Sequence, residues 1–291
     1  MSTAPLPAGS ARGVLSGVIR RSRDFFWYGS PRLAGSRARD LAAVYAFFRL
    51  ADDAADETSD TAESLARLDA LESELDRCYA GAPSAPFAPL ARAIGARDLP
   101  RRDFAALLEG MRRDRRISEY RTYAELLDYC RLAANPAGRV ALRIFDAFEP
   151  ENVEPSDRVC TGLALANFWR DVGPDLDRGR VYLPEEDRVR FGVTRESLRA
   201  RRADAPFRAL LAFEISRARA FLREGARIVT RLPRALAWRV EASSNGGLSL
   251  LDRIERVNGD VFDARPRIGR GWKARGAAAA WLRTIFRRGA P

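Results

Sequence analysis

The chain of 291 residues contains no histidine. Without an imidazole, the sequence excludes Ser-His-Asp and Cys-His catalysis, histidine-ligated zinc and imidazole acid–base chemistry. Any chemistry in this protein must therefore use carboxylates, a metal ion, arginine, tyrosine or water.

Cysteine is scarce as well, with Cys78, Cys130 and Cys160 far apart in the chain. An odd number without a CxxC pair indicates neither a disulfide framework nor a zinc site. We expect all three to be small core residues of a protein in a reducing cytoplasm.

Long apolar runs are missing too. No stretch approaches the eighteen or so apolar residues that cross a bilayer, and the N-terminus lacks the compact apolar region of a signal peptide. The hydrophobic fraction of 46% is ordinary for a globular protein. We therefore expect a cytoplasmic protein that is soluble or peripheral on the inner face of the membrane.

Lysine is almost absent, since Lys273 is the only one, so arginine carries the net charge of +11. Such a balance favours anionic partners, namely phosphate groups, an acidic membrane surface or nucleic acid. A nucleic-acid binder would gather its arginines on one face with interleaved aromatics. Here the arginines are spread beside acids over nearly every predicted helix, so we expect no nucleic-acid partner.

Apolar residues recur at spacings of three and four, which predicts helices throughout. The predicted helices are Ala42 to Glu57, Thr61 to Tyr79 with Asp60 as N-cap, Asp103 to Arg112, Tyr123 to Asn135, Asp157 to Asp171, a long helix through Leu211 and Val229, and Gly246 to Ile254. Pro136 should kink or divide the fourth of these, and Gly138 should permit a close helix approach. No strand run, internal repeat or linker is seen, so we predict a single all-α domain.

This domain is predicted to span residues 22–270, after a loose N-terminal segment of residues 1–21. The tail, residues 271–291, places Trp281 and Phe286 among arginines. Such a basic amphipathic helix suits an anionic membrane surface. Alternatively, the tail docks against the core of the protein instead of a membrane.

Two stretches place oxygen ligands at helical spacing. Asp52 and Asp56 share a helical face with Tyr45 and Arg49. In the second stretch Asn167, Asp171 and Asp175 step by four residues, and Arg178-Gly-Arg-Val-Tyr-Leu-Pro184 follows. Pro174 should bend this second helix, because proline lacks an amide donor.

An isolated pair of acids at this spacing usually marks a solvated helix surface. Two such faces, each with an arginine within one turn, favour a shared site instead. The repulsion between like charges costs a helix a few tenths of a kcal/mol per pair, and a divalent cation would offset it. Mg²⁺ takes carboxylate and amide oxygens, and substrate phosphate commonly completes its shell.

With these motifs, the sequence between about Ser22 and Ile268 resembles the squalene/phytoene synthase family. Three stretches are most similar to the bacterial hydroxysqualene synthases of hopanoid pathways. These are Tyr129-Cys-Arg-Leu-Ala-Ala-Asn-Pro-Ala-Gly-Arg139, Ala166-Asn-Phe-Trp-Arg-Asp171, and Gly246-Gly-Leu together with Ile254-Glu and Asp260-Val-Phe-Asp-Ala-Arg-Pro266.

The resemblance implies an isoprenoid-synthase-like helical bundle with a central apolar cavity. It implies Mg²⁺, with Mn²⁺ as a substitute, and no nicotinamide. The implied metal ligands are Asp52, Asp56, Asn167, Asp171 and Asp175. The implied substrate contacts are Ser22, Arg23, Tyr45, Arg49, Asn167, Arg170, Arg178 and Arg180, with Tyr129 as a catalytic residue facing the cavity. Candidates for the cavity wall are Phe25, Phe26, Phe47, Phe48, Leu163 and Phe168.

The implied reaction is ionisation of presqualene diphosphate and capture of the rearranged cation by water, which gives hydroxysqualene. One alternative is condensation of two farnesyl or geranylgeranyl diphosphates to presqualene diphosphate, squalene or phytoene. A second is a non-catalytic scaffold member of the family beside other enzymes of the squalene and hopanoid pathway. Departures from the family pattern at Asp24, Pro174 and Gly259 are the reason to keep that second alternative.

Overall fold

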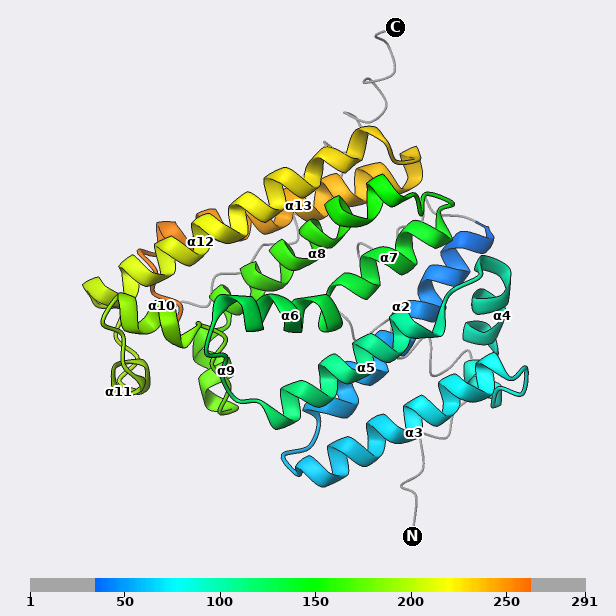
Figure 1. Cartoon of the computed structure of the whole chain (residues 1–291), viewed down its shortest axis with the longest axis horizontal. Coiled ribbons are helices and arrows are strands. Elements are labelled where there is room, and N and C mark those ends of the chain that lie inside the picture. Colours follow the sequence, from blue (N-terminus) through cyan, green and yellow to red (C-terminus); the bar gives the residue numbers. More distant parts are fainter. Residues whose placement is uncertain (1–34, 263–291) are drawn as a thin grey trace, which may run out of the picture. The chain divides into compact units, whose positions relative to one another are not determined.

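The computed structural model describes residues 35–262, which form helices joined by short loops (Figure 1). Within this range there is no strand, and the single β-bridge joins Glu119 and Val181. The described residues divide into two compact units. Unit 1 comprises residues 35–116 with Arg139–Phe148, and unit 2 comprises Ile117–Gly138 with residues 149–262. The all-α prediction is confirmed, whereas the single domain over residues 22–270 stays a prediction.

Unit 1 contains four helices that lie before residue 117. They are α2 (Ser36–Asp56), α3 (Thr61–Tyr79), α4 (Ala88–Arg97) and α5 (Arg101–Arg116), with the 3₁₀ turn η1 (Ala85–Phe87). Helix α2 contacts the other three. Its Phe47 is almost fully buried and meets Phe104 of α5 edge to face, at 5.5 Å between ring centroids. This packing orients α2 and leaves Asp52 and Asp53 half-buried and Asp56 exposed.

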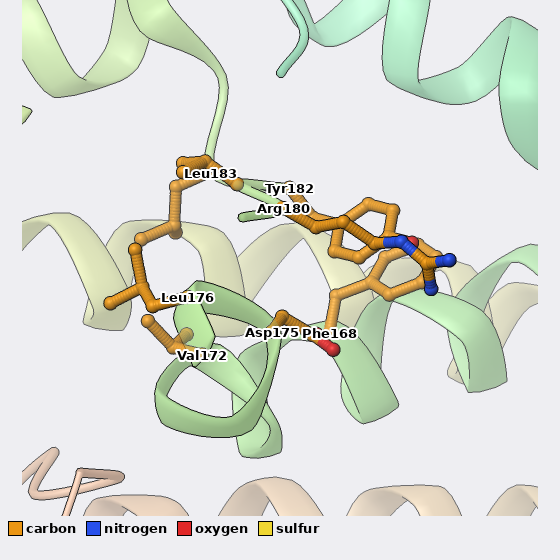
Figure 2. A pocket seen from close by; sticks show the side chains of 8 residues that line it. Phe168, Val172, Asp175, Leu176, Arg180, Tyr182 and Leu183 are labelled. Atoms are coloured by element: carbon orange, nitrogen blue, oxygen red, sulfur yellow. The ribbon is translucent and has the colours of Figure 1, made fainter. Parts of the chain in front are cut away.

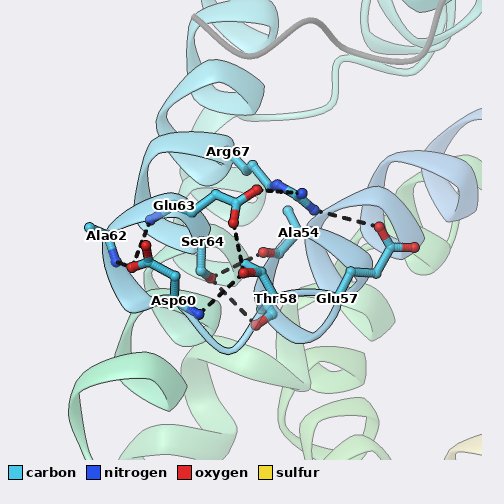
Figure 3. A network of polar contacts seen from close by, with 9 residues as sticks. Ala54, Glu57, Thr58, Asp60, Ala62, Glu63, Ser64 and Arg67 are labelled. Atoms are coloured by element: carbon cyan, nitrogen blue, oxygen red, sulfur yellow. Dashed lines mark hydrogen bonds and ion pairs between the residues drawn. The ribbon is translucent and has the colours of Figure 1, made fainter.

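The turn between α2 and α3 is held by a polar network (Figure 3). As predicted, Asp60 is the N-cap of α3, and its Oδ1 accepts from the Ala62 amide at 2.8 Å. The Ser64 hydroxyl donates to the Ala54 carbonyl of α2 at 3.0 Å. Arg67 lies 2.7 Å from Glu63. These contacts satisfy helix ends that would otherwise leave unpaired backbone groups.

Replacing Asp60 with alanine is expected to lower the free energy of unfolding by about 1 kcal/mol, because the cap acceptor is lost. Urea unfolding followed by circular dichroism measures this change. Asparagine caps as well as aspartate, so Asp60→Asn is the matched control and should stay near wild type. Equal losses in the two variants would assign the effect to charge rather than to capping.

Unit 2 is built on three long helices that run side by side (Figure 1): α8 (Pro150–Arg170), α12 (Ala205–Gly225) and α13 (Arg234–Arg256). Helix α6 (Tyr123–Ala133) packs on α8. The shorter elements are α9 (Val172–Asp177), α10 (Glu185–Arg190), α11 (Arg195–Arg199) and the 3₁₀ turn η2 (Ala226–Thr230). Helix α7 (Asn135–Ile144) begins in unit 2 and continues into unit 1.

Glycines allow the helices of unit 2 to approach closely. A Cβ on Gly225 of α12 would lie 2.7 Å from the Val159 amide nitrogen and 2.8 Å from the Pro155 carbonyl oxygen of α8. A Cβ on Gly138 would lie 2.6 Å from the Ser156 hydroxyl, which confirms the close approach predicted there. The predicted division before Pro136 is also confirmed, since α6 ends at Ala133.

Several predicted helices are too short. Helix α2 begins at Ser36 rather than Ala42, α8 at Pro150 rather than Asp157, and α13 at Arg234 rather than Gly246. Polar and charged residues dominate these added turns of α2 and α8, so apolar periodicity does not reveal them.

The three cysteines are free, as predicted. Cys78 and Cys130 are buried in the core, and Cys160 is half-buried. No helix among residues 35–262 is long and apolar enough to cross a bilayer. The predicted loose segment 1–21 and the tail 271–291 lie outside the described residues.

Candidate active site

The first acidic face lies near the C-terminal end of α2. Arg49 Nη1 donates to Asp52 Oδ2 at 2.6 Å, and Arg49 Nη2 lies 2.6 Å from Asp53 Oδ1. Tyr45 on the same helix is half-buried, and Asp56 is exposed. The structure therefore joins Arg49 to Asp52 as the sequence suggested. Asp53 was missed, although its spacing of four residues from Arg49 signals this ion pair.

Crowding of carboxylates affects Asp52. Partial burial raises the pKa of Asp52 to about 6, against the opposing effect of Arg49, and Asp56, Asp53 and Asp114 raise it further. Since 45% of the Asp52 side-chain surface is exposed, solvent screens part of this effect. A bound cation is the natural way to relieve this repulsion.

The second acidic face is not one continuous helix. Helix α8 ends at Arg170, and Asp171 has φ −102° and ψ 17°. Pro174 has no amide hydrogen to donate to the Arg170 carbonyl, so the ladder breaks there. Asp175 consequently lies on α9, and the predicted bend at Pro174 is confirmed as a break between two helices. The Asp175 amide still donates to the Asp171 carbonyl at 2.8 Å, so the two residues remain one turn apart.

Asp171 is held by its neighbour in the sequence. Arg170 Nε donates to Asp171 Oδ1 at 2.8 Å, and Arg170 Nη2 pairs with the other oxygen. This two-point contact is the geometry that guanidinium favours with carboxylate. Asn167, one turn earlier, is exposed. Both acidic faces thus carry an arginine bound directly to a predicted metal ligand.

A small pocket, partly open to solvent, lies beside α9 (Figure 2). Its lining combines apolar side chains with one acid and one arginine: Phe168, Val172, Asp175, Leu176, Arg180, Val181, Tyr182 and Leu183. Figure 2 shows Val172, Leu176 and Leu183 on one side and the Arg180 guanidinium on the other. Arg180 is buried, whereas Arg178 is exposed and its Nη1 lies 3.8 Å from Asp175 Oδ1.

Two aromatic rings, those of Phe168 and Tyr182, line this pocket, and Tyr129 packs against both. Phe168 stacks on Tyr182 with 4.1 Å between centroids and an interplanar angle of 7°. Tyr129, buried on α6, lies 5.8 Å from Tyr182 and 6.0 Å from Phe168. We call Tyr129, Phe168 and Tyr182 the aromatic panel. Tyr182 was missed as a panel member, because only the fold brings the segment after α9 against α8.

The donor chemistry of the acidic faces fits a hard divalent cation. Carboxylate and amide oxygens suit Mg²⁺, which usually keeps several waters and takes substrate phosphate as a ligand. Among residues 35–262, no group of three or more acidic side chains converges closely enough to hold a metal ion by itself. The two faces belong to different units, and their joint site stays a prediction.

Residues 19–272 match the family described as squalene/phytoene synthase. The chain belongs to the squalene/phytoene synthase family. Ser22 and Arg23, the remaining predicted substrate contacts, lie within this match but outside the described residues, as do Asp24, Phe25 and Phe26.

Relatives within the squalene/phytoene synthase family include phytoene synthases and a squalene synthase. The chain is 30% identical to the phytoene synthase of Arthrospira platensis over 254 residues, which cover 82% of each protein. It is 30% identical to the chloroplastic phytoene synthase of Daucus carota over 269 residues, 90% of this chain and 67% of that one.

Among solved structures, squalene synthase HpnC from Alicyclobacillus acidocaldarius has 36% identity and a TM-score of 0.78, covering 85% of this chain and 95% of that chain. A dehydrosqualene synthase has a TM-score of 0.84 at 23% identity, covering 94% and 96%, and shows the fold alone. These similarities confirm the isoprenoid-synthase-like helical fold of the squalene/phytoene synthase family.

Proposed function

We propose that this protein ionises presqualene diphosphate with the help of Mg²⁺ and captures the rearranged cation with water, forming hydroxysqualene. The observation that carries the proposal is the pocket in which a buried arginine and an acid, Arg180 and Asp175, adjoin an aromatic panel. Such a pocket combines charged groups that can bind a diphosphate and its metal with aromatic rings that can stabilise a hydrocarbon cation. The 36% identity to squalene synthase HpnC supports a C30 product.

The polar groups would act on the leaving group. Asp52, Asp56, Asn167, Asp171 and Asp175 are the residues that would hold Mg²⁺. When bound, the metal would neutralise charge that develops on the departing diphosphate. Arg49, Arg170 and Arg180 would donate to the phosphate oxygens, because guanidinium binds phosphate in a two-point geometry. Tyr45 and Arg178 are proposed as further contacts.

The aromatic panel would act on the carbon skeleton. Breaking the carbon–oxygen bond of presqualene diphosphate leaves a cyclopropylcarbinyl cation, which rearranges to an allylic-type cation. The rings of Tyr129, Phe168 and Tyr182 would stabilise both cations by cation–π attraction. An apolar wall also keeps water from reaching the cation early. Water then adds and loses one proton, so presqualene diphosphate and water give hydroxysqualene and diphosphate. This balance needs no reductant, and hence no nicotinamide.

A second candidate is head-to-head condensation of two prenyl diphosphates. The observation that favours it is the 30% identity to phytoene synthases over 82% or more of this chain. Condensation would use the same acidic faces and arginines, but with farnesyl or geranylgeranyl diphosphate as substrate.

Product analysis separates these candidates. Purified protein is incubated with Mg²⁺ and, separately, presqualene, farnesyl or geranylgeranyl diphosphate in ¹⁸O-labelled water, and products are identified by mass spectrometry. We expect a C30 alcohol carrying ¹⁸O from presqualene diphosphate. Phytoene from geranylgeranyl diphosphate, or presqualene diphosphate as the end product from farnesyl diphosphate, would favour condensation. Absence of turnover with all three would favour the non-catalytic scaffold member.

The proposed product is nearly insoluble in water, so it must leave to a membrane or to a following enzyme. We propose an anionic membrane surface and other enzymes of the squalene and hopanoid pathway as partners. The basic tail, residues 271–291, is the predicted contact. Omitting anionic lipid from a vesicle-binding assay should abolish co-sedimentation of the protein.

A further inference from the structure

Unit 2 contains a buried charged cluster that the proposed chemistry does not use. Glu214 on α12 has a fully buried side chain, and Asp187 on α10 is 3% exposed. Arg217 Nη1 donates to Asp187 Oδ2 at 2.6 Å and lies 3.4 Å from Glu214 Oε1. One guanidinium therefore faces two carboxyl groups. We call Asp187, Glu214 and Arg217 the anchor cluster.

Aromatic rings fix the arginine of the anchor cluster. The Arg217 guanidinium lies 4.1 Å from the ring centroids of both Tyr123, on α6, and Phe213, on α12. The Tyr123 hydroxyl and Glu214 Oε2 accept no hydrogen bond and donate none within the described part of the chain. The cluster thus connects α10, α12 and the start of α6.

A proton balances the charge of this cluster. Burial raises the pKa of Glu214 to about 8; Arg217 opposes the rise, and the adjacent Asp187 carboxylate adds to it. Burial likewise raises the pKa of Tyr123, with Glu214 as a further cause and Arg217 opposing, so the phenol stays neutral. At neutral pH, Glu214 is therefore a neutral carboxylic acid beside the Asp187 carboxylate. One arginine and one carboxylate then cancel.

Helix α10, which carries Asp187 of the anchor cluster, follows a segment of the candidate site in the chain. Asp187 follows Pro184 by three residues, and the segment 178–184 carries Arg178, Arg180 and Tyr182. Its other support is the stretch 118–121. The Val181 amide donates to the Ser118 carbonyl at 2.7 Å, and the Glu185 amide donates to the Tyr120 carbonyl at 2.9 Å.

We propose that Glu214, Arg217 and Asp187 form a positioning network that fixes α10 against α12, and thereby holds the segment 178–184 in place for the substrate diphosphate. This inference rests on the proposed function, since it assigns Arg178 and Arg180 to the diphosphate. The three residues touch no substrate; they act through the segment that α10 follows.

The network has a defined pH dependence. The folded pKa of Glu214 lies above its unfolded value, so the protonated state favours folding and this contribution is lost as pH rises through about 8. Deprotonation places a second negative charge beside the Asp187 carboxylate. The repulsion between Glu214 and Asp187 then weakens the contact of α10 with α12. Glu214→Gln keeps the shape and a donor but cannot ionise.

Three variants test the proposal. We expect Glu214→Ala to raise KM for the prenyl diphosphate about tenfold, which corresponds to about 1.4 kcal/mol, with a smaller effect on kcat. It should also speed amide hydrogen exchange in residues 178–190 more than elsewhere in unit 2. In Glu214→Gln, both KM and the amide hydrogen exchange of residues 178–190 should stay near the wild-type values. Glu224→Gln, at an exposed glutamate of α12 that pairs with Arg158, is the matched control and should change neither.

The pH series gives an independent readout. Between about pH 6 and pH 9, KM and the intrinsic-rate-corrected exchange of residues 178–190 should rise in the wild type and stay flat in Glu214→Gln. Equal pH dependence in the two proteins overturns the proposal, even if Glu214→Ala does not fold. A Glu214→Ala protein that folds with normal KM and exchange also overturns it. If no prenyl diphosphate is turned over, the proposed function fails, whereas the exchange measurements still test the network.

Discussion

Replacing Asp171 with asparagine is expected to lower prenyl diphosphate turnover by at least about 100-fold, with little change in the unfolding temperature. The substitution removes a carboxylate from the proposed metal site and breaks its two-point contact with Arg170. It also removes charge repulsion near Asp175, so the fold should tolerate it. A coupled assay of diphosphate release measures the turnover rate. Asp52→Asn should have a comparable effect through the first acidic face.

The control for this prediction lies in the same segment. Asp177 is an exposed acid of α9 that pairs with Arg201, and neither residue lines the pocket. Asp177→Asn should keep nearly full turnover. If Asp171→Asn or Asp52→Asn retained a rate like that of Asp177→Asn, the metal assignment would be wrong.

Replacing Gly225 with alanine is expected to reduce the free energy of unfolding by about 3 kcal/mol. The added Cβ would meet the backbone of α8 at Val159 and Pro155, and backbone atoms cannot rotate away as a side chain can. Helix propensity alone would favour alanine here by up to about 1 kcal/mol, since Gly225 has the helical φ of −63°. The sign of the change therefore reports the contact between α8 and α12.

Gly95 provides the comparison. It lies in α4, is exposed, and a Cβ there meets no heavy atom within 4 Å. Gly95→Ala should stabilise the protein by about 0.5–1 kcal/mol through helix propensity. Urea unfolding of Gly225→Ala and Gly95→Ala measures both changes in the free energy of unfolding. Stabilisation by Gly225→Ala as well would show that α8 and α12 are further apart than described.

Local patterns in the sequence predicted much of the fold. Helix α3 has the predicted bounds, Thr61 to Tyr79, because Asp60 supplies a cap and leucines recur on one face. Pro136 and Pro174 interrupt helices for a reason that is local, namely the missing amide donor. In each case the residues that decide the structure lie within one or two turns of each other.

The candidate site was predicted only as far as local spacing reaches. Arg49 with Asp52 could be read from the sequence, since they share a helical face. The approach of Asp114 to Asp52 could not, because it depends on packing of α5 against α2. Nor could the anchor cluster, in which Asp187 and Arg217 are thirty residues apart. Isolated acids and arginines in a sequence are indistinguishable from surface charge until the fold buries them.

The course of the chain through its two units has a consequence for any attempt to divide the protein. Unit 1 consists of two separate stretches, and so does unit 2, with the single helix α7 continuing from one unit into the other. No single cut in the gene can therefore yield two complete halves. A fragment ending at Arg116 carries Asp52 but lacks Arg139–Phe148, and the complementary fragment carries Asp171 together with a stretch that belongs to its neighbour. We therefore expect the two acidic motifs to fold correctly only as parts of one polypeptide.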